Sequence, residues 1–162
     1  MLPLAAQNNN IIRLAVAQAL AGANSVVFYA TGAIVGNTIA PSPSLATLPI
    51  TLFVLGMAAS ILPFGALARK RGRKAAFMAG TGAGVVTGLA AALAVVLGSF
   101  LLFCFAAMLG GAYAAVALSF RFAATDGVAP ERRARALSLV MGGGVAAGII
   151  GPMLVTGTMH LW

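Results

Sequence analysis

Long apolar runs separated by short charged joints dominate the pattern along this chain. All ten Lys and Arg residues lie at three places, namely Arg13, the run 69–74 and the group between Arg121 and Arg135. Between these places the chain is apolar over stretches long enough to form membrane helices, which need about 20 residues each. The predicted spans are residues 11–39, 46–68, 75–97, 99–124 and 130–158.

The charge pattern also predicts an orientation. Basic residues near the ends of membrane spans stay in the cytoplasm. The joints at 40–45 and 98–99 carry no charge, so the chain crosses twice between each pair of basic clusters. We therefore expect the amino terminus and the 69–74 and 124–133 loops to be cytoplasmic. An odd number of spans leaves the carboxyl end outside, where Trp162 fits the membrane interface.

Composition supports an all-α membrane protein, a bundle of five transmembrane helices. The chain is 61% hydrophobic and 7% charged, whereas soluble domains carry roughly 25% charged residues. The apolar runs are continuous, whereas the strands of a membrane barrel would alternate. A net charge of +8 can indicate a nucleic-acid partner. Here the cations lie in joints between apolar runs, so we expect contact with the lipid bilayer and none with nucleic acid.

Small residues recur at helical spacing inside the predicted spans. Removing Cβ lets helix backbones approach closely in lipid, so these positions predict either helix packing or a sliding surface. They are Gly32 and Gly36 in the first span, Gly80, Gly84 and Gly88 in the third, and Gly144 and Gly148 in the fifth.

The segment from Gly65 to Lys74 resembles the signature loop of major facilitator superfamily (MFS) transporters, G-x-L-A-D-R-x-G-R-K, between their second and third helices. The residues that match are Gly65, Leu67, Ala68, Gly72, Arg73 and Lys74, with Lys70 a conservative replacement. Arg69 stands where the family usually has Asp, and it reverses the charge of a residue that latches the cytoplasmic side in the family. We expect a close helix crossing at Gly65 and a tight turn at Gly72.

The layout of the spans resembles the amino-terminal half of the same family. The segment 120–126, followed by 135–138, is similar to the region between the fourth and fifth helices of uncharacterised bacterial members. The resemblance implies a secondary active transporter of a small solute, working by alternating access in the bacterial inner membrane. The chain would be a fragment with five of twelve helices, completed by a missing carboxyl-terminal half or by another membrane chain.

Polar side chains at membrane depth are the candidates for a substrate cavity. They are Gln18, Asn24, Ser25 and Tyr29 in the first span and Tyr113 in the fourth. Polar groups in hydrocarbon need a partner in the protein or a water-filled cavity. The sequence leaves open whether they join helices by hydrogen bonds or line a path. The resemblance favours a path, because the first and fourth helices line the cavity in the family.

The pair Gly151-Pro152 predicts a kink in the fifth span, since proline removes a backbone hydrogen bond. The family's antiporters carry a longer Gly-rich motif here. This chain keeps Gly151 and Pro152 of it, but has Ala147, Val155 and Thr156 where that motif has glycine. A structural kink is therefore the favoured interpretation.

Little in the sequence indicates other chemistry. Glycine runs do not follow strands as nucleotide loops do, and His160 has no neighbouring Cys or acid to complete a metal site. We expect no enzyme activity, no metal and no cofactor. Arg121, near a span end, is expected to snorkel to the interface. The alternative function is a non-transporting membrane subunit or scaffold that associates through its glycine-rich helix faces.

Overall fold

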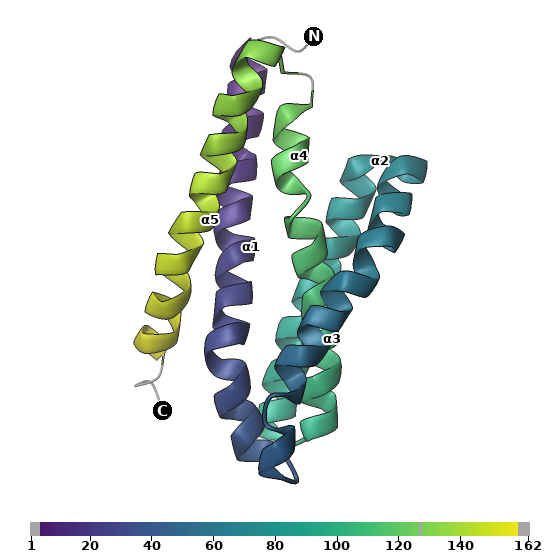
Figure 1. The fold of residues 1–162 in the computed structure, drawn as a ribbon, viewed down its shortest axis with the longest axis vertical. Coiled ribbons are helices and arrows are strands. Elements are labelled where there is room, and N and C mark those ends of the chain that lie inside the picture. The colour runs from purple at the N-terminus through teal and green to yellow at the C-terminus, as the bar shows by residue number, and fades with distance from the viewer. Residues whose placement is uncertain (1–3, 127, 159–162) are drawn as a thin grey trace. The chain divides into compact units, whose positions relative to one another are not determined.

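The computed structural model describes residues 4–126 and 128–158, and within them it is helical without strands (Figure 1). The prediction of an all-α protein is confirmed. The elements are α1 (Leu4–Ile39), a short 3₁₀ helix (Pro43–Leu45), α2 (Leu48–Val96), α3 (Phe100–Ala117), α4 (Phe120–Thr125) and α5 (Pro130–Thr158).

The chain divides into two compact units, which are described separately. The first contains the residues up to Val26 and those from Ala117 onward, and it comprises the beginning of α1 with α4 and α5. The second runs from Val27 to Val116 and comprises the end of α1, all of α2 and nearly all of α3.

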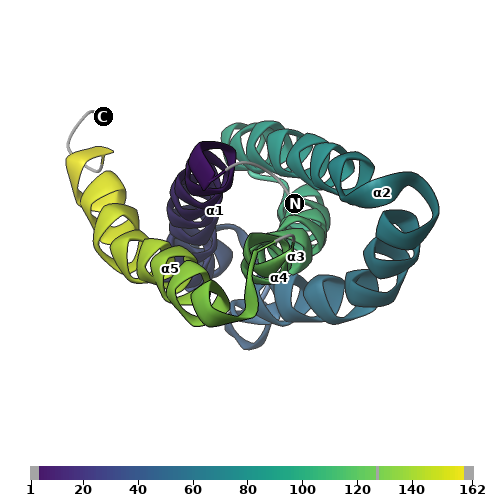
Figure 2. The same cartoon turned by 90° about the horizontal axis from the view of Figure 1, so that it is seen from above.

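The helix α2 contains a sharp reversal at Gly72. Its 49 residues include one non-helical residue, Gly72, with φ 84° and ψ 162°, a conformation that is essentially restricted to glycine. Figure 2 shows α2 turning back on itself as two arms. Among the described residues, four helices are long and apolar enough to cross a membrane. The reversal at Gly72 divides α2 into two arms at the predicted 69–74 loop. Each arm could cross the membrane separately, so five crossings are compatible with the structure and remain a prediction.

A glycine also ends the second arm of α2. Gly98 has φ 60°, and the amide of Ser99 donates to the carbonyl of Ala94 at 2.8 Å. The amide of Gly98 donates to Val95 at 3.2 Å. This pair of bonds is a Schellman motif, which satisfies the last carbonyls of a helix. The uncharged joint predicted at 98–99 is therefore a helix C-cap.

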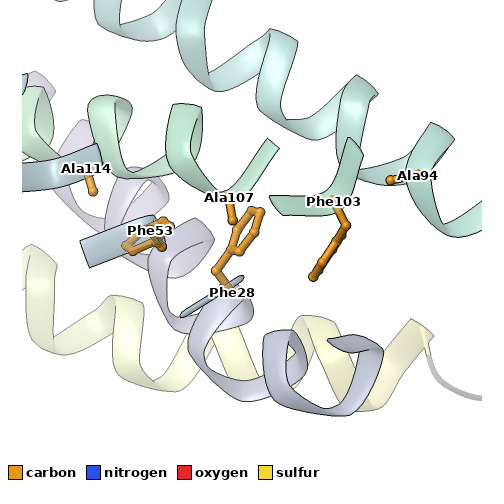
Figure 3. Close-up of a cluster of buried hydrophobic side chains, with 6 residues drawn as sticks. All are labelled: Phe28, Phe53, Ala94, Phe103, Ala107 and Ala114. Carbon is orange, nitrogen blue, oxygen red and sulfur yellow. The ribbon is translucent and has the colours of Figure 1, made fainter. Parts of the chain in front are cut away.

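Aromatic rings fill the core of the second unit (Figure 3). Phe28 of α1 stacks on Phe53 of α2 with ring centroids 5.4 Å apart and on Phe103 of α3 at 6.0 Å. Ala94, Ala107 and Ala114 complete the buried cluster. The small alanines let the three aromatic rings meet at the centre of the helix packing.

Backbones of α2 and α3 touch beside this core. A Cβ added to Gly111 would collide with the carbonyl oxygen of Phe53 and lie 2.6 Å from the amide nitrogen of Met57. A Cβ added to Gly56 would collide with the carbonyl group of Met108. Glycine at both positions is what allows the two helices to cross so closely.

In the first unit a buried stripe of α5 packs on α1. Ala136, Val140 and Ala147 are at most 1% exposed, and Gly151 lies against Val26. On the same stripe, Gly143 abuts the backbone carbonyl of Ala15, and Ala147 abuts Gly22. The contact positions recur every three or four residues, as one helix face requires.

The close contacts predicted at Gly144 and Gly148 are not found within the described residues. A Cβ at either position would meet no atom within 4 Å. The helical period that starts from Ala136 passes through Gly143 and leaves its neighbour Gly144 off the stripe. Close contacts are found at four of the other predicted glycines. A Cβ added to Gly32, Gly36, Gly80 or Gly84 would lie within 3.3 Å of a neighbouring atom, whereas at Gly88 it would meet none within 4 Å.

The exterior suits a lipid environment. Large apolar side chains are exposed on every long helix, with Leu62, Val96 and Leu101 at least 80% exposed. Several threonine hydroxyls in the helices bond to their own backbone, as when Thr31 donates to the carbonyl of Val27 at 2.8 Å. Lipid offers no hydrogen-bond partners, so polar groups inside a membrane must be paired within the protein.

Candidate functional site

The basic loop lies at the reversal of α2. Arg69, Lys70, Arg71, Arg73 and Lys74 are all exposed on either side of Gly72. The predicted turn at Gly72 is confirmed by its positive φ. Leu67 and Ala68 are half-buried in the first arm of α2.

The close crossing predicted at Gly65 is not found among the described residues. A Cβ added there would meet no atom within 4 Å, and the residue is exposed. The glycine that carries the close crossing of the first α2 arm is Gly56, nine residues and about two and a half turns earlier. The signature spacing therefore identifies the turn correctly but not the crossing.

The first unit contains a cavity of about 150 Å³. Gln18 of α1 and Arg121 of α4 are two polar residues in its lining. Its other lining residues are Leu118, Val140, Met141 and Gly144. An amide and a guanidinium among apolar residues are groups that could donate hydrogen bonds to a polar solute.

Arg121 has an unusual environment for a basic residue near a span end. Its Nε is buried without a hydrogen-bond partner, and its guanidinium carbon lies 5.0 Å from the ring centroid of Phe122. The sequence predicted snorkelling to the interface, and this stays a prediction, while the structure adds that Arg121 lines the cavity. The break between α3 and α4 at Leu118 and Ser119 makes this possible, because it carries Arg121 on a separate short helix.

The remaining cavity candidates are distributed over both units. Asn24 and Ser25 are half-buried in the first unit and do not line the cavity beside Gln18. In the second unit Tyr29 is 46% exposed, with its ring edge-on to Phe53 at 5.3 Å. Tyr113 is half-buried, and its ring covers the Cα face of Gly84. Of the five candidates, the structure therefore brings Gln18 to a described cavity, and the roles of the others stay predictions.

The pair Gly151-Pro152 lies inside a continuous helix assignment. α5 runs through Pro152 to Thr158, and Gly151 is buried against Val26 and the carbonyl of Ala23. Gly151 thus serves close packing on α1, and the kink stays a prediction.

Metal-binding groups are sparse in the part of the chain that the structure describes. No three His, Cys, Asp or Glu side chains gather there. His160 and Trp162 lie outside the described residues. Cys104 is a buried free thiol in α3.

Comparison with known proteins gives a family match and several relatives. The model of the Major Facilitator Superfamily matches residues 14–162. The chain is 41% identical over 153 residues to the riboflavin transporter RfnT of Brucella anthropi, covering 94% of this chain and 38% of that protein. It is 30% identical over 142 residues to the uncharacterised MFS-type transporter YdeG of Bacillus subtilis, covering 88% of this chain and 33% of that protein. No solved structure gives a significant match.

Proposed function

Because this chain belongs to the Major Facilitator Superfamily, we propose that it forms the amino-terminal part of a secondary active transporter for a small solute. The family match over residues 14–162 is the observation that carries the proposal. The chain spans 38% of the length of the Brucella relative. The mechanism is alternating access, in which two helical halves rock about a site near the middle of the membrane. A carboxyl-terminal part or another chain supplies the second half.

Open glycine positions support a second half. Gly65 and Gly148 have no atom of the described chain within 4 Å of an added Cβ. Small residues at helix surfaces allow other helices to approach closely in lipid. The proposal assigns these faces to packing against the remaining helices of the transporter.

The substrate class proposed is a flavin or a similar polar heterocycle. The relative that is 41% identical is named a riboflavin transporter. Riboflavin presents ring carbonyls and ring nitrogens that accept hydrogen bonds, and Gln18 and Arg121 offer amide and guanidinium donors in one cavity. The apolar remainder of the wall, including Val140 and Met141, suits the faces of a fused ring.

A chimaera tests transport directly. The 162-residue chain replaces the matching segment of the Brucella transporter, and uptake of labelled riboflavin is measured in a host that cannot make it. We expect uptake well above that of an empty vector. A chimaera that reaches the membrane in normal amount and takes up no more riboflavin than the vector would contradict the proposed substrate and role.

The polar cavity gives a prediction in the same chimaera. Arg121→Gln is expected to raise the riboflavin concentration for half-maximal uptake about tenfold or more, because a hydrogen bond to a charged group contributes about 1.5–3 kcal/mol. Gln18→Ala should act in the same direction. The matched control is Arg71→Gln, which removes one exposed cation of the basic loop. If Arg121→Gln behaves like Arg71→Gln, the cavity takes no part in substrate binding.

A further inference from the structure

A second cavity of the first unit, of about 250 Å³, is lined by residues near the beginnings of α1 and α5. Its polar wall consists of Arg132 and Arg135 of α5 and Asn8 of α1. Arg132 and Arg135 are three residues apart and so share one face of the helix. No Asp or Glu belongs to the described lining of this cavity.

A neutral side chain binds one of the two arginines. Nη2 of Arg132 donates to the side-chain oxygen of Asn8 at 3.2 Å. This bond fixes the guanidinium without neutralising it, and a guanidinium has five donors in all. Arg135 is exposed beside it. Two guanidinium groups on one wall present the planar, multiple donors that bind phosphate oxygens well.

The remaining lining of the cavity is apolar, and part of it is exposed. Ile12 of α1 is 60% exposed and Leu139 of α5 is 51% exposed, and both line the cavity. Both lie inside segments that are long and apolar enough to cross a membrane. The cavity therefore joins a cationic end to an apolar surface, which matches an amphiphile with an anionic head and a hydrocarbon tail.

We propose that this cavity binds an anionic phospholipid, with the phosphate on Arg132 and Arg135 and an acyl chain along Ile12 and Leu139. Basic pockets between membrane helices are known to bind anionic headgroups. A free phosphate would use the arginines alone and would leave the apolar wall without a role. The site is separate from the cavity of Gln18 and Arg121, and the proposal does not depend on the transported substrate.

Binding to the unaltered chain is the first test. The purified 162-residue chain in a neutral detergent is titrated with dioleoylphosphatidylglycerol or with dioleoylphosphatidylcholine, and bound lipid is counted by native mass spectrometry. The two lipids have identical acyl chains, so they differ only in the headgroup. We expect the anionic lipid to bind roughly tenfold more tightly or better, since each basic residue adds attraction to anionic lipid. Equal binding of the two lipids overturns the proposal.

Matched variants locate the site. The double variant Arg132→Gln, Arg135→Gln is compared with Arg69→Gln, Arg71→Gln, which removes the same charge from the exposed basic loop. The first should lose roughly tenfold in phosphatidylglycerol affinity, and the second should lose less than about twofold because it leaves the cavity intact. Equal losses would show that net charge alone attracts the lipid, and the proposal would fail.

A third comparison separates a lipid from a free anion. Ile12→Ser combined with Leu139→Ser should weaken phosphatidylglycerol binding, and millimolar inorganic phosphate should not displace the lipid from the unaltered chain. Displacement by phosphate, with no effect of the two serines, would identify a simple anion site and overturn the proposal. Circular dichroism of each variant checks helix content, and the comparison of the two lipids on the unaltered chain stands without any variant.

Discussion

Replacing Gly111 by alanine is expected to lower the free energy of unfolding by roughly 3 kcal/mol, at the upper end for overpacked sites. The added methyl would collide with the carbonyl oxygen of Phe53 and lie 2.6 Å from the amide of Met57. Both obstacles are backbone atoms, so no side-chain rotation relieves the overlap. The two helices must separate, which also loosens the ring cluster of Phe28 and Phe103 (Figure 3). Unfolding in detergent followed by circular dichroism measures the change.

Gly88→Ala is the matched control. Gly88 lies in the second arm of α2, and an added Cβ meets no atom within 4 Å. Alanine is favoured over glycine in a helix interior by about 0.5–1 kcal/mol, so this variant should be unchanged or slightly more stable. Similar effects of the two substitutions would show that α2 and α3 do not cross backbone to backbone at Gly111.

Replacing Gly72 by asparagine should cost about 2 kcal/mol, within the range for strained backbone. The φ of 84° and ψ of 162° at Gly72 lie where residues with a Cβ are essentially excluded. Asparagine would force the turn into another conformation and disturb the pairing of the two arms of α2. The midpoint of unfolding in detergent, together with the amount of protein inserted in membranes, measures the effect.

The same substitution at Gly98 supplies the comparison. Gly98 has φ 60° in the C-cap of α2, the left-handed conformation that asparagine tolerates best after glycine. Gly98→Asn should therefore cost less than Gly72→Asn. The reverse order would mean that the reversal of α2 does not depend on the backbone of Gly72.

The sequence predicted the helices well because apolar runs and their interruptions are local signals. The ends at Ile39 and Thr158 and the start at Pro130 agree with the predicted span limits. The turn at Gly72 was predicted too, from its place in the segment that resembles the signature loop of the family. Helix α1 begins earlier than predicted, at Leu4, because the polar residues before Ile11 continue the helix beyond its apolar part.

Helix register was harder to predict. The run Gly142, Gly143 and Gly144 offers three adjacent contact positions that local sequence does not distinguish. Packing selects Gly143, since it shares the stripe of Ala136 and Val140. Gly56 and Gly111 were missed for a related reason, because the point where two helices cross depends on their relative placement and not on spacing within one helix.

The candidate site was partly predictable. Gln18 was chosen as a polar group at membrane depth, and it does line a cavity. Arg121 was assigned to the interface because it lies near the end of an apolar run. Its place on the cavity wall follows from the break between α3 and α4, where Leu118 and Ser119 interrupt the helix. Neither residue is helix-breaking, so the sequence carried no clear signal of that break.

Single-cysteine mapping shows on which side of the membrane each predicted loop lies, and so tests the five crossings. Ser44, Lys70, Leu97 and Glu131 are replaced by cysteine one at a time, with Cys104→Ala in each to remove the only native thiol. An impermeant thiol reagent is then applied to intact and to permeabilised cells. We expect labelling at positions 44 and 97 in intact cells, and labelling at positions 70 and 131 only after permeabilisation. Labelling of positions 44 and 70 from the same side would rule out five crossings, because the first arm of α2 would then not cross the membrane.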